Sequence, residues 1–206
     1  MQESELQKGH LFVITAPSGT GKSTIIEMVR GNLGEVYYSI SHTTRAPRDG
    51  EVNGVHYHFV SRQAFEKMIQ AGEFIEWAVV YDQLYGTSTS AVESALSSGK
   101  DILLDLDIQG ALEVKRQFSE STLIFIFPPS LEVLKERLQN RSMHDDTNIE
   151  LRMKRAEEEI SKCKDYDFLI VNNALEQSVK EVEAIIISQR ARTKRRLPFF
   201  QKIFHL

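Results

Sequence analysis

Short apolar runs, each bounded by polar or turn-forming residues, recur along the chain. They are Leu11–Ile14, Val36–Ser41, Asp101–Asp107, Leu123–Phe127 and Phe168–Asn172. Between most of them, apolar residues recur every three or four positions, which is the spacing of a helix with one buried face. This pattern predicts an α/β fold: an open parallel sheet of about five strands, flanked by helices, with ligands bound at the carboxyl ends of the strands.

The periodic segments predict the helices around this sheet. They are Thr24–Val29, Leu131–Arg141, Asn148–Cys163 and Ser178 to about Arg196. Ser130 is placed to cap the second of these helices, whose Leu131, Leu134 and Leu138 share one face. The polar segment Ser142–Thr147 separates the second helix from the third.

Residues from about 36 to 90 follow a different pattern. Val52–Val60 alternates apolar and polar residues as a strand does, Phe74–Tyr81 is a second apolar run, and Tyr85–Ser88 is predicted to begin a helix. We therefore expect a small, partly antiparallel insertion here, between core segments 9–35 and 91–190. His56 and His58 have the spacing of metal ligands on a strand, but no further ligand completes a site, and we predict surface histidines.

Composition limits the classes of protein that fit. The 206 residues are 41% hydrophobic and 26% charged, as in one compact globular domain. The net charge of −4 argues against nucleic acid as the main partner. Cys163 is the only cysteine. The first residues are polar and acidic, unlike a signal peptide. No apolar run approaches the ~18 residues of a membrane span. We expect a cytoplasmic protein that does not act on a membrane.

The strongest motif is a glycine-rich loop between the first strand and the first helix. It comprises Ala16, Pro17, Ser18, Gly19, Thr20, Gly21, Lys22 and Ser23, with Thr24 after it. A strand, a glycine-rich turn and a Lys-Ser pair at a helix start form a P-loop, whose N–H groups surround phosphates. Lys22 would reach the β- and γ-phosphates and Ser23 would hold Mg²⁺. The strict pattern begins with Gly, and Ala16 stands there. The alternative is a βα turn without a ligand.

Two carboxylates end the strand that follows the insertion. Asp105 and Asp107 are candidates to hold Mg²⁺ through water, if their strand neighbours the P-loop strand. They are also candidates to contact the nucleotide that accepts a phosphoryl group. Their spacing by two predicts that both side chains lie on one face of the strand. The alternative is a pair of solubilising charges at a strand end.

The insertion carries a candidate clamp for a phosphate monoester. Arg45 and Arg48 flank Pro47 in a stiff loop, and two forked guanidinium groups suit phosphate oxygens. Tyr57 and Tyr85 are possible further donors. The alternative is a solvated arginine pair with two core tyrosines.

Glu76 lies within an apolar run, so its carboxylate needs a buried partner. A guanine edge provides one, because N1–H and the N2 amino group both donate, whereas adenine lacks this pair of donors. The hydroxyls of Ser41 and Thr87 could donate to guanine O6. The alternative is an ion pair with a nearby lysine or arginine.

Four arginines surround the polar turn near residue 145. Arg137 and Arg141 are four apart on one helix, and Arg152 and Arg155 follow on the next. The set predicts a lid, residues 137–156, that closes over transferring phosphates, although each arginine alone also fits a solvated face.

Residues 191–206 form a basic and aromatic tail. The pattern does not distinguish whether this tail docks on the body of the protein or on a partner.

Taken together, these segments resemble the guanylate kinase family over nearly the whole chain, residues 9–190. The similar stretches are APSGTGKST, SISHTTRAPRDGEVNGVHYHFVS, GEFIEWA, YGTS, ILLDLDIQG and DFLIVNN. The resemblance implies a core, a GMP-binding insertion and a lid, and the Mg²⁺-dependent reaction ATP + GMP ⇌ ADP + GDP. This chain has Ala16 where the family more often has Gly, and Thr87 where the family also has Ser. Both residues preserve the required chemistry.

The resemblance also assigns roles. Guanine contacts are implied for Ser41, Glu76, Thr87 and Asp105; GMP phosphate contacts for Arg45, Arg48, Tyr57 and Tyr85; contacts with the transferring phosphoryl group for Lys22, Arg137, Arg141 and Arg152; and a place near adenine for Asn172. Arg45 is counted with the catalytic cations as well. Two alternatives remain: a non-catalytic module of the same fold that binds phosphorylated peptides, and a P-loop kinase for another monophosphate. Oligomeric state stays open.

Overall fold

The computed structural model describes residues 8–34, 36–80, 82–142 and 149–205, without the side chains of residues 141 and 142. Its centre is a five-stranded sheet of order β2-β7-β1-β8-β9, in which every pair is parallel. The strands are β1 Leu11–Thr15, β2 Val36–Tyr38, β7 Asp101–Asp105, β8 Thr122–Phe127 and β9 Phe168–Val171. The predicted open parallel sheet is confirmed.

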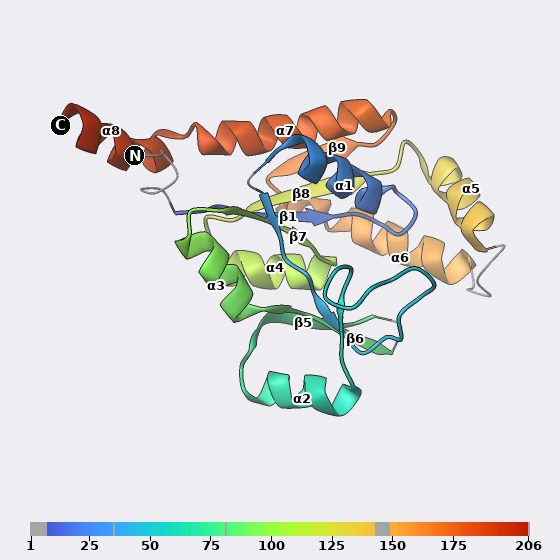
Figure 1. Cartoon of the computed structure of the whole chain (residues 1–206). Coiled ribbons are helices and arrows are strands. Elements are labelled where there is room, and N and C mark those ends of the chain that lie inside the picture. The colour runs from blue at the N-terminus through green and yellow to red at the C-terminus, as the bar shows by residue number, and fades with distance from the viewer. Residues whose placement is uncertain (1–7, 35, 81, 143–148, 206) are drawn as a thin grey trace.

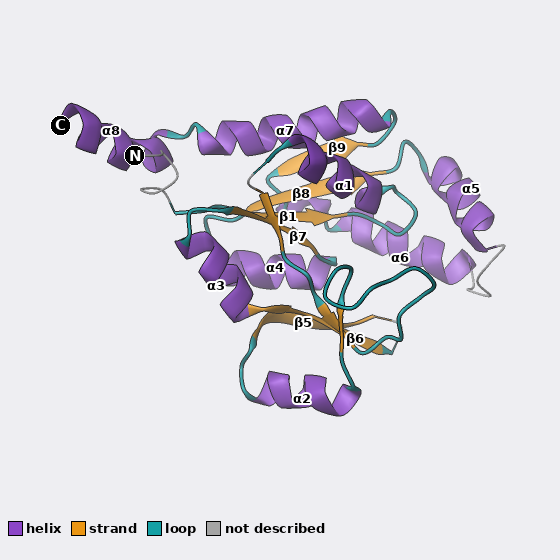
Figure 2. Cartoon of the chain, viewed as in Figure 1, coloured by secondary structure: helices purple, strands orange, loops and turns teal. Residues whose placement is uncertain are grey.

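Helices cover both faces of this sheet because β1 is apolar on both. Phe12 and Ile14 pack with α1 Lys22–Asn32 and α7 Leu175–Arg190, whereas Leu11 and Val13 pack on the opposite side. That side is covered by α3 Thr89–Ser97 and α4 Ile108–Gln117 (Figures 1 and 2). The residues that form β1 are thus buried by helices from both halves of the chain.

A second sheet of four strands lies beside this core, in the order β4-β3-β6-β5. Its strands are β3 His42–Thr43, β4 His58–Phe59, β5 Phe74–Val80 and β6 Gln83–Ser88, and α2 Arg62–Gln70 connects β4 to β5. Only β3 and β4 are parallel, so the sheet is mixed as predicted. Helix α4 contacts β5 and links the two sheets (Figure 1).

The structure corrects two predictions within this region. Val52–Val60 is mostly a turn rather than a strand: Gly50 and Gly54 adopt positive φ, and the apolar side chains at 52 and 55 are exposed. Its pairing is limited to β4 and to an isolated bridge between Asn53 and Tyr57. Tyr85–Ser88 belongs to β6 rather than to a helix, because it pairs with β5, and α3 begins after Ser88, whose side chain accepts from Ala91 N.

Several strand and helix boundaries also differ from the prediction. Strand β7 ends at Asp105, and Asp107 instead caps α4, accepting from Gly110 N at 2.8 Å. The last predicted helix is two helices, α7 and α8 Thr193–Phe204, separated at residues 191–192. The predicted helices Leu131–Arg141 and Asn148–Cys163 correspond to α5 Leu131–Ser142 and α6 Ile149–Ser161. A 3₁₀ turn, Cys163–Asp165, follows α6. The connection 143–148 lies outside the described residues. No helix in the described ranges has the length and apolar character needed to cross a membrane.

Asp101 ties the carboxyl-terminal helices to the sheet. Its side chain is only 4% exposed, and it accepts from His10 N at 2.9 Å, Arg190 Nε at 2.6 Å and Arg195 Nη2 at 2.8 Å. Arg190 ends α7 and Arg195 lies in the first turn of α8. A buried carboxylate with two guanidinium partners therefore fixes both helices on the amino end of β7.

We predict that Asp101→Ala lowers the free energy of unfolding by about 2–4 kcal/mol, because it leaves two partly buried arginines without their carboxylate. Urea titration measures this. The matched control is Glu120→Ala, which removes the ion pair with Lys194; both side chains are at least 70% exposed, and we expect a far smaller loss because water already solvates both charges. Equal losses in the two variants would contradict the anchoring role.

Candidate active site

A cleft of about 790 Å³ lies where the carboxyl ends of the large sheet face the small sheet. The P-loop and the residues after β7 line one side, β5 and β6 line another, and α5 and α6 contribute arginines. The residues predicted from motifs far apart in sequence are therefore largely brought together around one space.

The P-loop is held by backbone geometry and by one amide. Gly19 and Gly21 have φ of 89° and 100°, which side chains rarely tolerate. Asn172, at the end of β9, donates from Nδ2 to Thr20 O at 2.7 Å and accepts from Ser178 Oγ at 3.1 Å. A Cβ on Gly21 would lie 2.7 Å from that Nδ2. Asn172 is buried behind the loop and outside the cleft lining, so its visible role is to support the loop.

The packing of Ala16 accounts for an alanine at the first P-loop position. Ala16 is 9% exposed, and its methyl group packs in the apolar cluster with Ile25 and Ile124. Lys22 begins α1 and pairs with Asp105, while its Nζ donates to Leu106 O at 3.3 Å. The cleft lining also includes the neighbouring hydroxyl groups and the second carboxylate, which are Ser23, Thr24 and Asp107.

Two arginines of the predicted lid contact the P-loop directly. Arg137 on α5 donates from Nη1 to Thr20 O at 3.2 Å, and Arg152 on α6 donates from Nη2 to Ser18 Oγ at 2.6 Å. Apolar contact between the two helices orients these side chains, through Leu134, Leu138, Ala156 and Met153. Arg155 lines the same cleft. The side chain of Arg141, also predicted here, lies outside the described residues.

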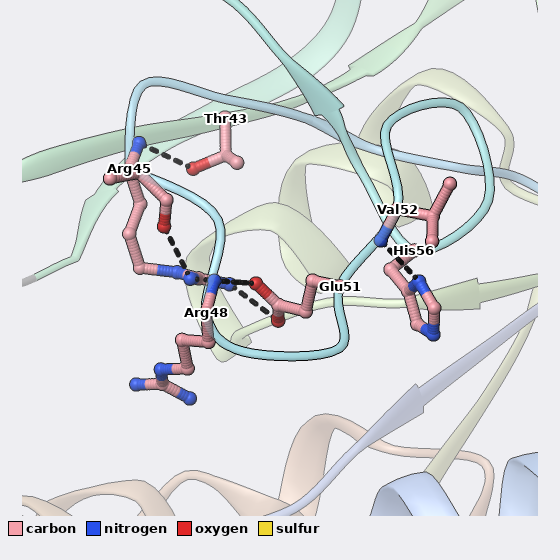
Figure 3. Close-up of polar contacts among 7 residues, drawn as sticks. Thr43, Arg45, Arg48, Glu51, Val52 and His56 are labelled. Carbon is pink, nitrogen blue, oxygen red and sulfur yellow. Dashed lines mark hydrogen bonds and ion pairs between the residues drawn. The ribbon is translucent and has the colours of Figure 1, made fainter.

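Glu51 organises the predicted phosphate clamp, and sequence reasoning missed it. Arg45 donates from Nη1 and Nη2 to the two Glu51 oxygens, each at 2.9 Å, and Arg48 N donates to Oε2 at 2.7 Å (Figure 3). This pairing raises the pKa of Arg45 and lowers that of Glu51. Figure 3 also shows the Arg48 guanidinium pointing away from Glu51, and Arg48 lines the cleft.

The loop that carries the clamp has further supports. Val52 N donates to His56 Nδ1 at 3.0 Å (Figure 3), so this exposed histidine stabilises the loop. His58 stacks on His42, with ring centroids 4.6 Å apart. Arg45 lies over the Tyr57 ring at 5.4 Å. Tyr57, Tyr85 and Ser41 all line the cleft.

Glu76 is 6% exposed and still lines the cleft. Among the described residues its side-chain partner is the Thr87 hydroxyl, which donates to Oε1 at 2.6 Å, rather than a lysine or arginine. A β-bulge between Phe74 and Glu76 changes the register of β5 and directs this side chain toward the core. Burial, together with the smaller effect of the Asp107 charge, raises the pKa of Glu76 to about 7, although the hydrogen bond from Thr87 acts in the opposite direction.

Glu159 on α6 is a second acidic residue of the cleft that the sequence analysis missed. Burial raises its pKa to about 7, against the opposing effect of the Lys22 charge. Its neighbours Glu157 and Glu158 are more exposed, although Glu158 also lines the cleft, so the run of three glutamates gave no signal that Glu159 is the most buried of them.

The raised pKa of Glu76 predicts a pH-dependent stability difference. Between pH 4.5 and about 7 the folded chain binds more protons at this site than the unfolded chain, so stability falls as pH rises through that window. Glu76→Gln removes the ionisation. We expect the variant to be more stable than the parent by about 1–3 kcal/mol at pH 8, and the difference to shrink toward zero below pH 5.

Urea titrations of both proteins at several pH values measure this difference. Glu159 titrates in the same window in parent and variant, so its contribution cancels in the comparison. A difference that does not vary with pH would contradict the buried, proton-binding state of Glu76.

Comparison with known proteins places this site in a family. A family model described as guanylate kinase matches residues 8–189. Curated guanylate kinases from Carboxydothermus hydrogenoformans and Idiomarina loihiensis are 46% and 48% identical, over 92% and 88% of this chain and 93% and 88% of theirs. A crystal structure of guanylate kinase from Anaplasma phagocytophilum superposes with a TM-score of 0.78 at 31% identity, over 97% of each chain. The chain belongs to the guanylate kinase family.

Proposed function

We propose that this chain transfers the γ-phosphoryl group of ATP to GMP and releases ADP and GDP. The observation that carries the proposal is the placement of two unlike sites on one cleft. A P-loop with Lys22 lies at one side, and the buried carboxylate of Glu76 with the Thr87 hydroxyl lies at the other. Guanine matches that carboxylate with two donors, N1–H and the N2 amino group.

The acceptor end has groups for both the base and the phosphate. We assign guanine O6 to Ser41 and Thr87, and a further contact on the same edge to Asp105. The phosphate of GMP is assigned to Arg48, Tyr57 and Tyr85, which line the cleft, and to Arg45, which Glu51 holds in the same loop. A clamp already held by an ion pair has less side-chain freedom to lose when it binds phosphate.

At the donor end, the P-loop N–H groups and Lys22 neutralise the phosphates of ATP. Arg137 and Arg152, which contact the P-loop, and Arg141 are the remaining cations assigned to the transferring group. The attacking GMP oxygen is already anionic at neutral pH, so the reaction needs no strong general base. Catalysis therefore consists of positioning and charge neutralisation. We keep a contact of Asn172 with adenine as a prediction separate from its support of the loop.

The donor set fits Mg²⁺. Ser23 follows the P-loop lysine and lines the cleft together with Asp105 and Asp107, and oxygen ligands are those that this hard cation prefers. Mg²⁺ bound there would neutralise phosphate charge. We also propose a cytoplasmic location on the basis of composition.

Neither alternative function is favoured. A phosphopeptide-binding module does not require a P-loop that binds ATP, whereas Gly21, Lys22 and Ser23 are intact here. A kinase for another monophosphate would have no use for a buried carboxylate placed to accept two hydrogen bonds.

An acceptor panel tests the proposal directly. We expect ADP release from ATP and Mg²⁺ with GMP, and little or none with AMP, UMP, CMP or dTMP. Glu76→Gln should weaken GMP binding by about 1–3 kcal/mol, because it loses a charge-assisted pair and presents an amide donor to a donor. The control is Glu66→Gln on the exposed face of α2. Preference for another acceptor would refute the assignment of Glu76.

Lys22→Ala tests the donor end. We expect kcat to fall by about 10²- to 10³-fold while the affinity for GMP, measured by calorimetry, stays at the parent value. Lys194→Ala, which removes an exposed lysine, is the control and should keep parent kinetics. Unaltered turnover in Lys22→Ala would defeat the proposed mechanism.

A further inference from the structure

Gly110 lies in the first turn of α4 and faces Glu76. A Cβ at this position would stand 2.6 Å from Glu76 Oε2, 3.1 Å from its Cδ and 3.4 Å from Asp107 Oδ1. The first of these distances is well inside van der Waals contact. Among all side chains, only the hydrogen of glycine leaves the space that this carboxyl group occupies.

Backbone conformation does not explain the glycine. Gly110 is absent from the residues with positive φ, and it lies within a helix that any residue can continue. Glycine in a helix is unfavourable relative to alanine, since it has more conformational freedom to lose on folding. The feature that requires glycine here is therefore the neighbouring carboxyl group rather than the local chain geometry.

The carboxyl group is enclosed from several sides. The Thr87 hydroxyl on β6 donates to Oε1, and the first turn of α4 lies against Oε2. Farther along α4, Gln117 donates from Nε2 to Ile75 O at 2.7 Å, next to the bulge that directs Glu76 inward. Helix α4 thus fixes both the strand that carries Glu76 and the position of its carboxyl group.

We propose that Gly110 is a positioning residue for base recognition: by lacking a side chain, it lets the first turn of α4 set where the Glu76 carboxylate presents itself to guanine. The inference rests on the proposed function of Glu76. Because the group that a Cβ would meet is the far end of a side chain, the molecule can relieve the contact by displacing the carboxylate. The cost then falls on GMP recognition and not on folding.

Gly110→Ala tests this role. We expect KM for GMP to rise about tenfold or more, kcat and KM for ATP to stay near parent values, and Tm to stay equal or rise. The matched control is Gly31→Ala in α1, where a Cβ would meet nothing within 4 Å. It makes the same chemical change in a helix, and it should keep the parent KM for GMP.

A double-mutant cycle with Glu76→Ala distinguishes an error in the assignment of Glu76 from an error in the role of Gly110. In that background the carboxylate is gone, so adding Gly110→Ala should leave GMP affinity, measured by calorimetry, unchanged. If Glu76→Ala itself binds GMP like the parent, the proposed guanine-binding carboxylate is wrong and the inference falls with it. If Glu76→Ala is impaired but Gly110→Ala binds GMP normally, only the positioning role is overturned.

Folding of the variants gives an independent readout. Should Gly110→Ala alone fail to fold, a folded Gly110→Ala/Glu76→Ala double variant would support the contact, because removal of the carboxylate restores the space. Failure of both to fold would overturn the proposal, as would an equal loss of GMP affinity from Gly110→Ala with and without Glu76.

Discussion

The pairing of β1 with β7 is the constraint on which the site depends. Ile14 stands opposite Asp105 in the register of these parallel strands, so the P-loop after β1 and the carboxylate at the end of β7 emerge side by side. Lys22 can then pair with Asp105 although 83 positions of sequence separate them. Both strands are buried on both faces, and a one-residue slip in their register would move each side chain into the opposite apolar cluster and disrupt the packing of both. The packing of the core thereby fixes the geometry of the site.

Charges around the cleft are held in place by partners within the chain. Arg45 is held by Glu51, and Arg137 and Arg152 by oxygens of the P-loop. Such contacts orient a long side chain before a substrate arrives, which lowers the entropic cost of binding. The same contacts join α5 and α6 to the P-loop.

Helix α4 has a comparable role between the core and the small sheet. Asp107 caps its amino terminus beside the phosphate site, Gly110 faces Glu76, and Gln117 bonds to the backbone of β5. One rigid helix of ten residues therefore spans the region between the two proposed substrates. The position of the Glu76 carboxylate relative to the P-loop therefore depends on a helix of the core.

The sequence by itself determined the parallel sheet, the P-loop and most candidate residues. Continuous apolar runs can be buried only between two layers of helices, and glycines before Lys-Ser have a local geometric meaning. It misplaced Tyr85–Ser88 and Val52–Val60, because pairing across strands and positive-φ glycines override local periodicity. The contacts of Glu51 and Gly110 and the burial of Glu159 depend on neighbours distant in the fold or across a turn. Tertiary structure decided those roles, since burial, charge and steric space belong to the assembled site rather than to any one segment.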